Sequence, residues 1–159
     1  MNNKNLISVL LPTYNCEKHI SESINSIINQ THKNWELLLI YDHSNDHTLD
    51  LLKYFSDLDK RIKIIYNEYE KGLVGALNTG INNSKGEYIM RMDSDDISVN
   101  NRMNSQLKYS TINNLDICGC HYISVNENGS FIKYNMVPVE NIFCRIALFS
   151  VVPFAHPTV

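Results

Sequence analysis

Three carboxylates stand close together in the stretch MRMDSDDIS, residues 90–98: Asp93, Asp95 and Asp96. Two carboxylates that lie two residues apart in an extended turn can both reach one hard cation, Mg²⁺ or Mn²⁺, directly or through a water molecule. A cation held in this way keeps coordination positions open for the oxygens of a diphosphate. The structural alternative is that Asp95 or Asp96 caps a following helix, where acidic side chains suit the helix dipole.

The segments around these carboxylates indicate which elements position them. Nearly continuous apolar runs predict buried strands at 6–11, 35–41, 62–66 and 87–92. Apolar residues at helical spacing predict helices at 16–28, 49–55, 73–81 (stopped near Gly86) and around 103–107. Strands that alternate with helices are typical of an α/β fold, here a Rossmann-like, mostly parallel sheet with helices on both faces.

A polar cluster follows each of the four predicted strands. The clusters are residues 12–15, 42–46, 67–72 and 93–96. Open α/β sheets bind ligands beyond the carboxyl ends of their strands. The four clusters are therefore expected to meet at one edge of the sheet, where three of them contribute carboxylates. This convergence favours the metal interpretation of Asp93 and Asp95 over the helix cap.

The chain after the fourth helix follows a different pattern. Residues 115–125 predict a strand, with Cys118 and Cys120 on one of its faces. A hairpin turn at 127–129 and a returning strand at 131–135 follow. This pattern indicates that the tail adds mixed strands to the fold.

The change of pattern divides a single domain into an α/β part, residues 1–112, and a mixed-strand part, residues 113–159. Hydrophobic residues make up 43% of the 159 residues, which suffices for one domain with a sizeable core. Apolar residues between 142 and 154 are expected to lie exposed in the second part. An exposed apolar surface of this kind predicts self-association.

Composition excludes several classes of partner. With 14 Lys and Arg against 17 Asp and Glu, the formal net charge is −3, so no nucleic-acid surface is expected. No apolar run approaches the roughly 20 residues that cross a membrane, so no transmembrane segment is predicted. The apolar run at 6–11 ends at Pro12 and is too short for a signal peptide.

The cysteines and histidines suggest no zinc site. The four cysteines contain no C-x-x-C pair, which indicates reduced thiols in a cytoplasmic protein, with peripheral attachment to a membrane left open. His43 and His47 lie four residues apart beside Asp42 and Asp46 and could bind zinc on a helix. A solvent-facing helix start is the favoured interpretation of this pair.

Several motifs, taken in order, resemble family-2 glycosyltransferases with the GT-A fold, which are inverting enzymes that use nucleotide sugars. VLLPTYN (9–15) is similar to the family's opening strand and nucleotide loop, and SINSIINQTHKNWELLLI (23–40) to its first helix and second strand. YDHSNDHT (41–48) is similar to the usual D-D-G-S-x-D-x-T. KGLVGALNTGINNSKGEYIMRMDSDD (71–96) is similar to the third helix, fourth strand and D-x-D motif.

The resemblance implies a donor site for a nucleotide sugar, with UDP as the nucleotide and Mn²⁺ or Mg²⁺ as the cofactor. Pro12, Thr13 and Tyr14 should line the base and ribose pocket, with help from Glu17. Asp42 matches the family acid that hydrogen-bonds the base, typically uracil.

The resemblance also assigns the remaining side chains. Lys71 lies in a loop that reaches the nucleotide or its phosphates, and Asn78 lies on the helix that faces the pocket. Asp93 should hold the ribose or a metal-bound water, Asp95 should bind the metal directly, and Asp96 should support or cap the turn.

The chain departs from the family pattern in two places. Tyr41 replaces the first acid of the usual D-D pair, and His43 replaces its glycine, which puts the loop shape and the nucleotide in question. The family's catalytic base is an Asp or Glu that we expect beyond Val159. PFAHPTV (153–159) resembles a segment that leads into the acceptor half, where His156 either lies near the acceptor or packs in a loop.

Three functions are therefore compared. The favoured one is transfer of a sugar from a UDP-linked donor to a hydroxyl of a glycan or lipid-linked acceptor, assisted by the metal. The alternative is a non-catalytic module that binds the nucleotide sugar and acts with a partner chain. A sugar-nucleotide pyrophosphorylase would need a Gly-rich loop with Arg after the first strand, where this chain has Pro12-Thr13-Tyr14.

Overall fold

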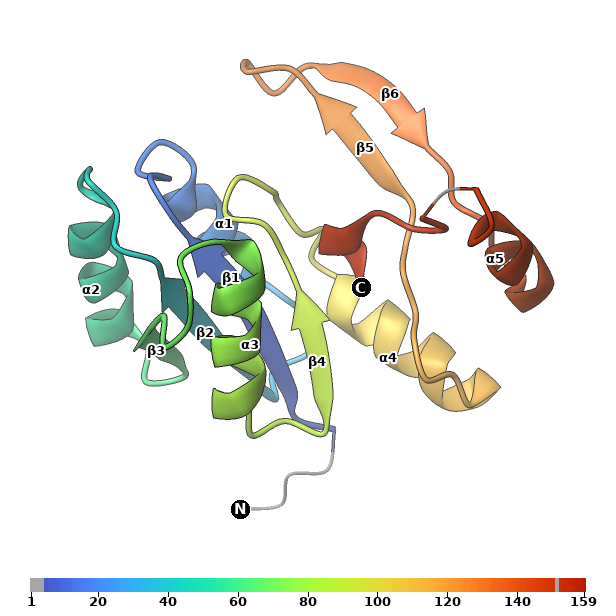
Figure 1. The fold of residues 1–159 in the computed structure, drawn as a ribbon, viewed down its shortest axis with the longest axis horizontal. Coiled ribbons are helices and arrows are strands. Elements are labelled where there is room, and N and C mark those ends of the chain that lie inside the picture. Colours follow the sequence, from blue (N-terminus) through green and yellow to red (C-terminus); the bar gives the residue numbers. More distant parts are fainter. Residues whose placement is uncertain (1–4, 151) are drawn as a thin grey trace.

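The computed structural model describes residues 5–150 and 152–159. Within them, strands and helices alternate along most of the chain (Figure 1). The strands are β1 (Ile7–Thr13), β2 (Trp35–Tyr41), β3 (Ile62–Tyr66), β4 (Tyr88–Arg91), β5 (Tyr122–Val125) and β6 (Phe131–Asn135). The helices are α1 (Ile20–Ile28), α2 (Thr48–Leu58), α3 (Leu73–Asn83), α4 (Arg102–Asn113) and α5 (Asn141–Ala147), followed by the 3-10 helix η1 (His156–Thr158).

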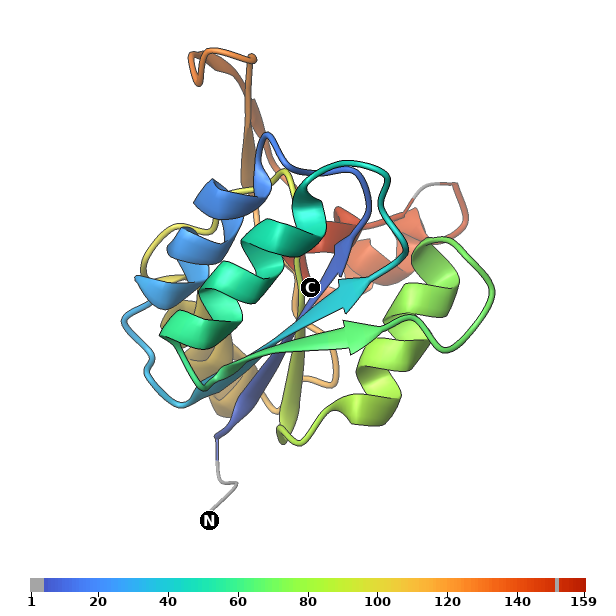
Figure 2. The same ribbon diagram turned by 90° about the vertical axis from the view of Figure 1, so that its left-hand side faces the viewer.

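Strands β1 to β4 form a parallel sheet in the order β3–β2–β1–β4. Helices α1 and α2 cover one face and α3 covers the other, which confirms the predicted α/β fold (Figure 2). The chain adds β2 and β3 on one side of β1, and then crosses over to add β4 on the other side. The strand order thus reverses between β1 and β4, and open α/β sheets bind ligands at such a reversal.

Burial on both faces explains the two central strands. Every residue of β2 is buried, and so is every residue of β1 except the half-buried Pro12. Their side chains alternate between a larger core under α1 and α2, with Leu11 and Leu39, and a smaller core under α3, with Leu10 and Ile40. Removing apolar surface from water, at about 25 cal/mol per Å², is the main term that favours this sheet.

Helix α3 ends at Asn83, close to the stop predicted near Gly86. The reason for a glycine at position 86 is its contact with β1. A Cβ at Gly86 would lie 2.6 Å from the amide nitrogen of Ser8 and 2.7 Å from the carbonyl oxygen of Leu6. Only a residue without a side chain therefore allows the chain to enter β4 directly beside β1.

The strand predicted at 115–125 is much shorter, because β5 begins only at Tyr122. The residues before it lie against the C-terminal segment: a Cβ at Gly119 would be 2.7 Å from the Cβ of Phe154. This close packing replaces strand pairing over 115–121. Cys118 and Cys120 therefore share no strand face, and that prediction was wrong.

The second part of the chain forms its own small sheet. Strands β5 and β6 pair antiparallel as a two-stranded sheet, with the expected hairpin turn, and do not join the parallel sheet (Figure 1). The expected apolar surface between 142 and 154 is confirmed: Phe143 is 55% exposed and Phe149 is 92% exposed. Across the described parts of the chain, no helix combines the length and apolar character that crossing a membrane requires.

Arg102, the first residue of α4, joins the C-terminal segment to the parallel sheet. Its buried Nη2 lies 3.0 Å from the carbonyl oxygen of Arg91, 3.0 Å from that of Pro157 and 3.4 Å from that of Val159. The amide of Arg91 donates to the carbonyl oxygen of Val159 at 2.7 Å. Residues 157–159 are thereby held at the end of β4.

Candidate functional site

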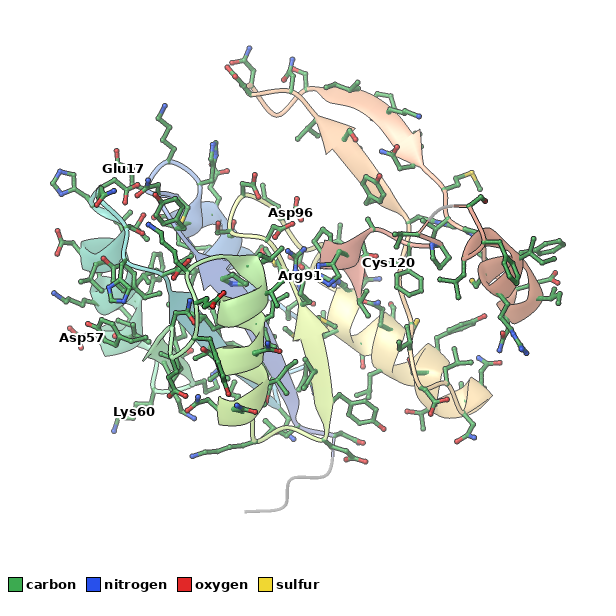
Figure 3. The ribbon with its side chains drawn as sticks, in the orientation of Figure 1. Glu17, Asp57, Lys60, Arg91, Asp96 and Cys120 are labelled. Atoms are coloured by element: carbon green, nitrogen blue, oxygen red, sulfur yellow. The ribbon has the colours of Figure 1, made fainter. Side chains whose placement is uncertain are left out.

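The polar clusters predicted from the sequence lie together in the structure. The loops after β1, β2, β3 and β4 all leave the carboxyl ends of the parallel strands, which we call the carboxyl edge. Glu17, from the first loop, and Asp96, from the fourth, lie at this edge, whereas Lys60 lies toward the opposite end (Figure 3). The predicted convergence of the four loops is confirmed.

The first two loops are tied together by reciprocal hydrogen bonds. The amide of Asn45 donates to Oδ1 of Asn15 at 2.8 Å, and the amide of Asn15 donates to Oγ of Ser44 at 3.0 Å. The amide of His47 donates to Oε2 of Glu17 at 2.9 Å. The Glu17 carboxylate, expected to help in the nucleotide pocket, therefore also holds the loop that begins α2.

Of the three residues predicted to line the pocket from β1, Tyr14 is the most exposed. Thr13 is 1% exposed, and its hydroxyl donates to a β2 carbonyl oxygen at 3.0 Å, so its side chain serves the sheet. Tyr14 is 46% exposed, and Nζ of Lys71 lies 4.1 Å from the centroid of its ring. The structure thus brings Tyr14 and Lys71 together as a cation–π pair.

Asp42 is 4% exposed and organises the loop that carries Lys71. Its Oδ1 accepts from Nδ2 of Asn67 and its Oδ2 accepts from the amide of Gly72, both at 2.8 Å. Oδ1 of Asn67 in turn accepts from the hydroxyl of Thr79 at 2.9 Å. A carboxylate oxygen can accept more than one hydrogen bond, so this structural role does not exclude the predicted contact with a base. On α3, the predicted Asn78 is exposed.

The two departures from the family pattern lie side by side. The ring of His43 is 5.8 Å from that of Tyr41 and 6.4 Å from that of Tyr66, while the two tyrosine rings are 5.6 Å apart. His43 adopts a φ of 53°, a left-handed conformation that favours glycine. The loop therefore keeps the backbone shape of a glycine and stabilises it with a cluster of aromatic rings.

The three carboxylates of residues 93–96, which we call the acidic turn, have different surroundings. Asp93 is half-buried and forms a bidentate ion pair with the buried Arg91, with Nη1 and Oδ2 2.7 Å apart. Asp95 is exposed and accepts no hydrogen bond from a residue that the structure describes. The pKa of the Asp96 carboxyl is raised, first because nearby protein atoms displace its water and then because Asp93 and Asp95 repel its charge.

The capping alternative for the acidic turn was wrong. Helix α4 begins at Arg102, six residues after Asp96, and its N-cap is Asn101, whose side chain makes no capping hydrogen bond. Neither Asp95 nor Asp96 therefore caps a helix. The prediction that Asp96 caps a helix was therefore wrong.

Buried polar residues of α1 and of the loop after it, to which the sequence reasoning gave no role, hold the acidic turn and the residues that follow it. The hydroxyl of Ser23 lies within hydrogen-bond distance of two carbonyl oxygens of the turn, at 2.8 and 2.7 Å. Oγ of Ser26 accepts from the amide of Ser98 at 3.1 Å, and Nε2 of Gln30 donates to the carbonyl oxygen of Val99 at 2.8 Å. Their spacing along one helical face, polar among buried isoleucines, is the signal that could have identified them.

The described residues form no metal site in which protein side chains supply all the ligands. Among residues 5–150 and 152–159, no three His, Cys, Asp or Glu side chains gather in a way that could hold a metal ion. The zinc alternative for His43 and His47 is therefore not supported. A Mg²⁺ or Mn²⁺ ion that takes one or two carboxylates, with substrate phosphates and water as its other ligands, still fits the exposed Asp95.

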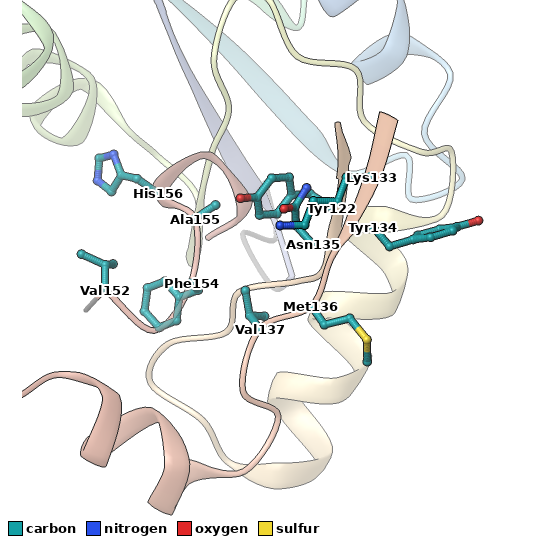
Figure 4. A pocket seen from close by; sticks show the side chains of 10 residues that line it. All are labelled: Tyr122, Lys133, Tyr134, Asn135, Met136, Val137, Val152, Phe154, Ala155 and His156. Carbon is teal, nitrogen blue, oxygen red and sulfur yellow. The ribbon is translucent and has the colours of Figure 1, made fainter. Parts of the chain in front are cut away.

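A pocket of about 560 Å³ lies between β5–β6 and residues 152–156 (Figure 4). Its lining combines aromatic and polar side chains, including Tyr122, Lys133 and Phe154, and contains no residue of the four loops. His156 also lines it and is exposed, so the packed-loop alternative for this histidine was wrong.

Comparison with known proteins gives the family. The model of glycosyl transferase family 2 matches residues 8–159. The UDP-Glc:alpha-D-GlcNAc-diphosphoundecaprenol beta-1,3-glucosyltransferase WfgD of Escherichia coli is 37% identical, over 97% of this chain and 65% of its own. The O-antigen biosynthesis glycosyltransferase WbnJ of Escherichia coli is 37% identical, over 96% of this chain and 60% of its own. The chain thus spans at most 65% of the length of these two relatives.

Solved structures agree with this result. S. aureus TarS 1-349 in complex with UDP-GlcNAc matches with a TM-score of 0.70 at 26% identity, over 76% of this chain and 35% of that chain. The mannosyltransferase PcManGT from Pyrobaculum calidifontis, solved with GDP-Man and Mn²⁺, shares the fold, with a TM-score of 0.63 at 20% identity over 71% and 33% of the two chains. These likenesses support the GT-A-like α/β fold. Because the family model covers nearly the whole chain, the protein belongs to glycosyl transferase family 2.

Proposed function

We propose that this chain forms the donor site of an enzyme that transfers a sugar from a UDP-linked donor to an acceptor hydroxyl, with inversion at the anomeric carbon. The observation that carries the proposal is the convergence of Tyr14, Asp42, Lys71 and the acidic turn at one sheet edge in a family 2 chain. UDP is favoured because TarS, which resembles this chain, has been solved with UDP and with UDP-GlcNAc.

The acceptor in this proposal is a glycan or a lipid-linked sugar. A lipid-linked acceptor is supported by the name of WfgD, which specifies a GlcNAc attached to diphosphoundecaprenol. A proton must leave the acceptor hydroxyl as it attacks, which requires a general base. We assign this role to no residue of the acidic turn, because those carboxylates serve the donor side in the proposal.

The side chains of the carboxyl edge have separate tasks in donor binding. The exposed ring of Tyr14 offers a face on which a nucleobase stacks, and Asp42 accepts a hydrogen bond from the base. The ammonium group of Lys71, held beside Tyr14, balances the negative charge of the diphosphate. Asp93 contacts the ribose or a water molecule on the metal.

The metal in the proposal is Mn²⁺ or Mg²⁺, bound directly by Asp95. Both ions prefer carboxylate, phosphate and water oxygens, and the exposed Asp95 carboxylate has no competing partner among the described residues. When bound, the ion supplies positive charge against the departing diphosphate.

Calorimetric titration with UDP tests the donor site. The wild-type chain is expected to bind UDP in the presence of Mn²⁺, and Asp95→Ala is expected to weaken that binding at least about tenfold. Asp57→Ala removes a carboxylate that is also exposed, at the distant end of α2, and should leave UDP binding unchanged. UDP affinity that is the same with Mn²⁺ and with EDTA would count against the metal.

Transfer assays separate the enzyme from the alternative function. A UDP-sugar and a lipid-diphosphate-linked acceptor are incubated with the protein, and the anomeric configuration of the product is read by NMR. Release of UDP with an inverted product supports the proposal, and a retained configuration contradicts it. UDP binding without any transfer by the full-length protein would favour a nucleotide-sugar-binding module that acts with a partner chain.

A further inference from the structure

The side chain of Arg91 is directed at one carboxylate of the acidic turn. Its Nη1 donates to Oδ2 of Asp93 at 2.7 Å, and its Nη2 contacts Oδ1 of the same residue. A guanidinium that meets a carboxylate with two parallel N–H groups fixes the plane of the carboxylate as well as its position. Both oxygens of Asp93 are therefore engaged by the protein itself.

Burial makes this pairing selective. The Arg91 side chain is 8% exposed, whereas Asp93 is 36% exposed, so the pair has a buried cation and an accessible anion. Nε of Arg91 is buried without a hydrogen-bond partner among the residues that the structure describes. Buried cations normally distribute their N–H groups over several acceptors. Arg91 instead directs its two terminal nitrogens to Asp93 alone.

The backbone of Arg91 is anchored on every side. It is paired in register with Leu10 of β1, its amide donates to Val159, and its carbonyl oxygen accepts from Arg102. The guanidinium therefore extends from a fixed point to a turn that is otherwise irregular. Asp95, two residues further along, has no such partner among the described residues.

From these contacts we infer that Arg91 is a positioning residue, which holds Asp93 for contact with the nucleotide sugar and keeps it from binding the metal directly. Asp95 is then the carboxylate that ligates the cation. The inference rests on the proposed function for the identity of the ligands. The two carboxylates of the D-x-D motif have different roles because only one of them is paired with a buried arginine.

A first experiment tests the positioning role without any ligand. Arg91→Met keeps roughly the length of the side chain but removes the guanidinium and its paired N–H groups, which we call the fork. Amide hydrogen exchange over residues 93–98 is therefore expected to accelerate at least about tenfold. Arg61→Met is the matched control, because Arg61 forms a similar fork with an aspartate two residues away, Asp59, at the other end of the sheet. Unchanged exchange over 93–98 in the Arg91 variant would overturn the inference.

A second experiment separates metal ligation from charge. UDP affinity is measured with Mn²⁺ and with EDTA. The ratio of these two affinities reports how much the metal contributes to UDP binding. Asp95→Asn should reduce this ratio to about one. The double variant Arg91→Met with Asp93→Asn removes the ion pair without changing the net charge. It should weaken UDP binding about tenfold in both media and keep the ratio within about threefold of wild type.

The outcomes distinguish the inference from the function on which it rests. If the ratio collapses in the double variant as it does in Asp95→Asn, Asp93 is a metal ligand and the inference is wrong. Arg91→Lys keeps the positive charge but loses the two parallel N–H groups, so it should keep the wild-type ratio and only part of the wild-type UDP affinity. If wild-type UDP affinity does not respond to Mn²⁺, the proposed metal fails, and hydrogen exchange still decides whether Arg91 positions the turn.

Discussion

Replacing Gln30 with methionine is expected to destabilise the protein at the segment before α4 and at the start of α4. The Gln30 side chain is fully buried, and its Oε1 accepts from the amide of Met103 at 3.1 Å. Its Nε2 donates to the carbonyl oxygens of Ser26 at 3.0 Å and Val99 at 2.8 Å. The first amides of a helix have no partner within the helix, so Gln30 caps α4 from another element.

The size of the effect follows from the groups that lose a partner. Met103 is fully buried, so leaving its amide without an acceptor should lower the free energy of unfolding by about 1–3 kcal/mol. Val99 is 66% exposed and water can replace the lost bond, so its carbonyl adds about 0.5–1.5 kcal/mol. Methionine fills nearly the same volume and adds no large cavity. The total is about 2–4 kcal/mol, which corresponds to a melting temperature lower by about 5–15 °C.

Urea denaturation, followed by circular dichroism, measures this change. Ile28→Met, at the end of α1 and two residues before Gln30, is the control. Ile28 is partly buried against the same core but its side chain makes no hydrogen bond, so this change should cost less than about 1.5 kcal/mol. Hydrogen exchange should also accelerate at the start of α4 in the Gln30 variant alone. A loss of stability below about 1 kcal/mol, or protection that persists at Met103, would refute the reasoning.

Three further predictions concern other parts of the fold. Burial alone would raise the pKa of Glu36, but hydrogen bonds from Lys63 and other partners outweigh it and lower the pKa. Its charged form therefore stabilises the fold above the usual Glu pKa, and that contribution is lost as the pH falls through the lowered value. Glu36→Gln should cost about 1–3 kcal/mol at pH 7 and much less at pH 3, and urea midpoints that differ equally at both pH values would contradict this. The His43→Ala variant should be less stable than the His43→Gly variant by about 1 kcal/mol in thermal melts, because φ at position 43 is 53°. The reverse order of stability would show that the left-handed conformation is not strained. Gly75→Ala should cost about 1–3 kcal/mol and speed hydrogen exchange over 67–72, because its Cβ would lie 2.0 Å from the carbonyl oxygen of Glu70; wild-type exchange there would contradict the clash.

The parallel sheet could be predicted because its signals are local. Continuous apolar runs such as 35–41 belong to strands buried on both faces, and helices between them leave little choice of topology. The strand predicted at 115–125 was too long because residues 115–121 pack against a segment that is distant in sequence. Gly119 packs on Phe154, and no local pattern announces a contact of that separation.

The place of the candidate site in the fold could be predicted from the sequence, but the contacts within it could not. Tyr14, Lys71 and the acidic turn do lie at one edge, as loop positions after parallel strands imply. The hydrogen bond between Glu17 and His47 joins residues that are 30 apart, so it depends on how two loops are shaped. The Arg91–Asp93 pair, by contrast, is only two residues apart and could have been read from the sequence.

The attachment of residues 157–159 to β4 through Arg102 bears on the order in which parts of the fold form during synthesis. These contacts join residues that are 55 and 57 apart, so a long stretch of chain must close before they form. Domains begin to fold while the ribosome still adds residues, from the N-terminal end. The parallel sheet can therefore assemble early, whereas the contacts of residues 157–159 with Arg91 and Arg102 form only after position 159 has emerged. A nascent chain should thus acquire the core of its sheet before the end of β4 is fully anchored.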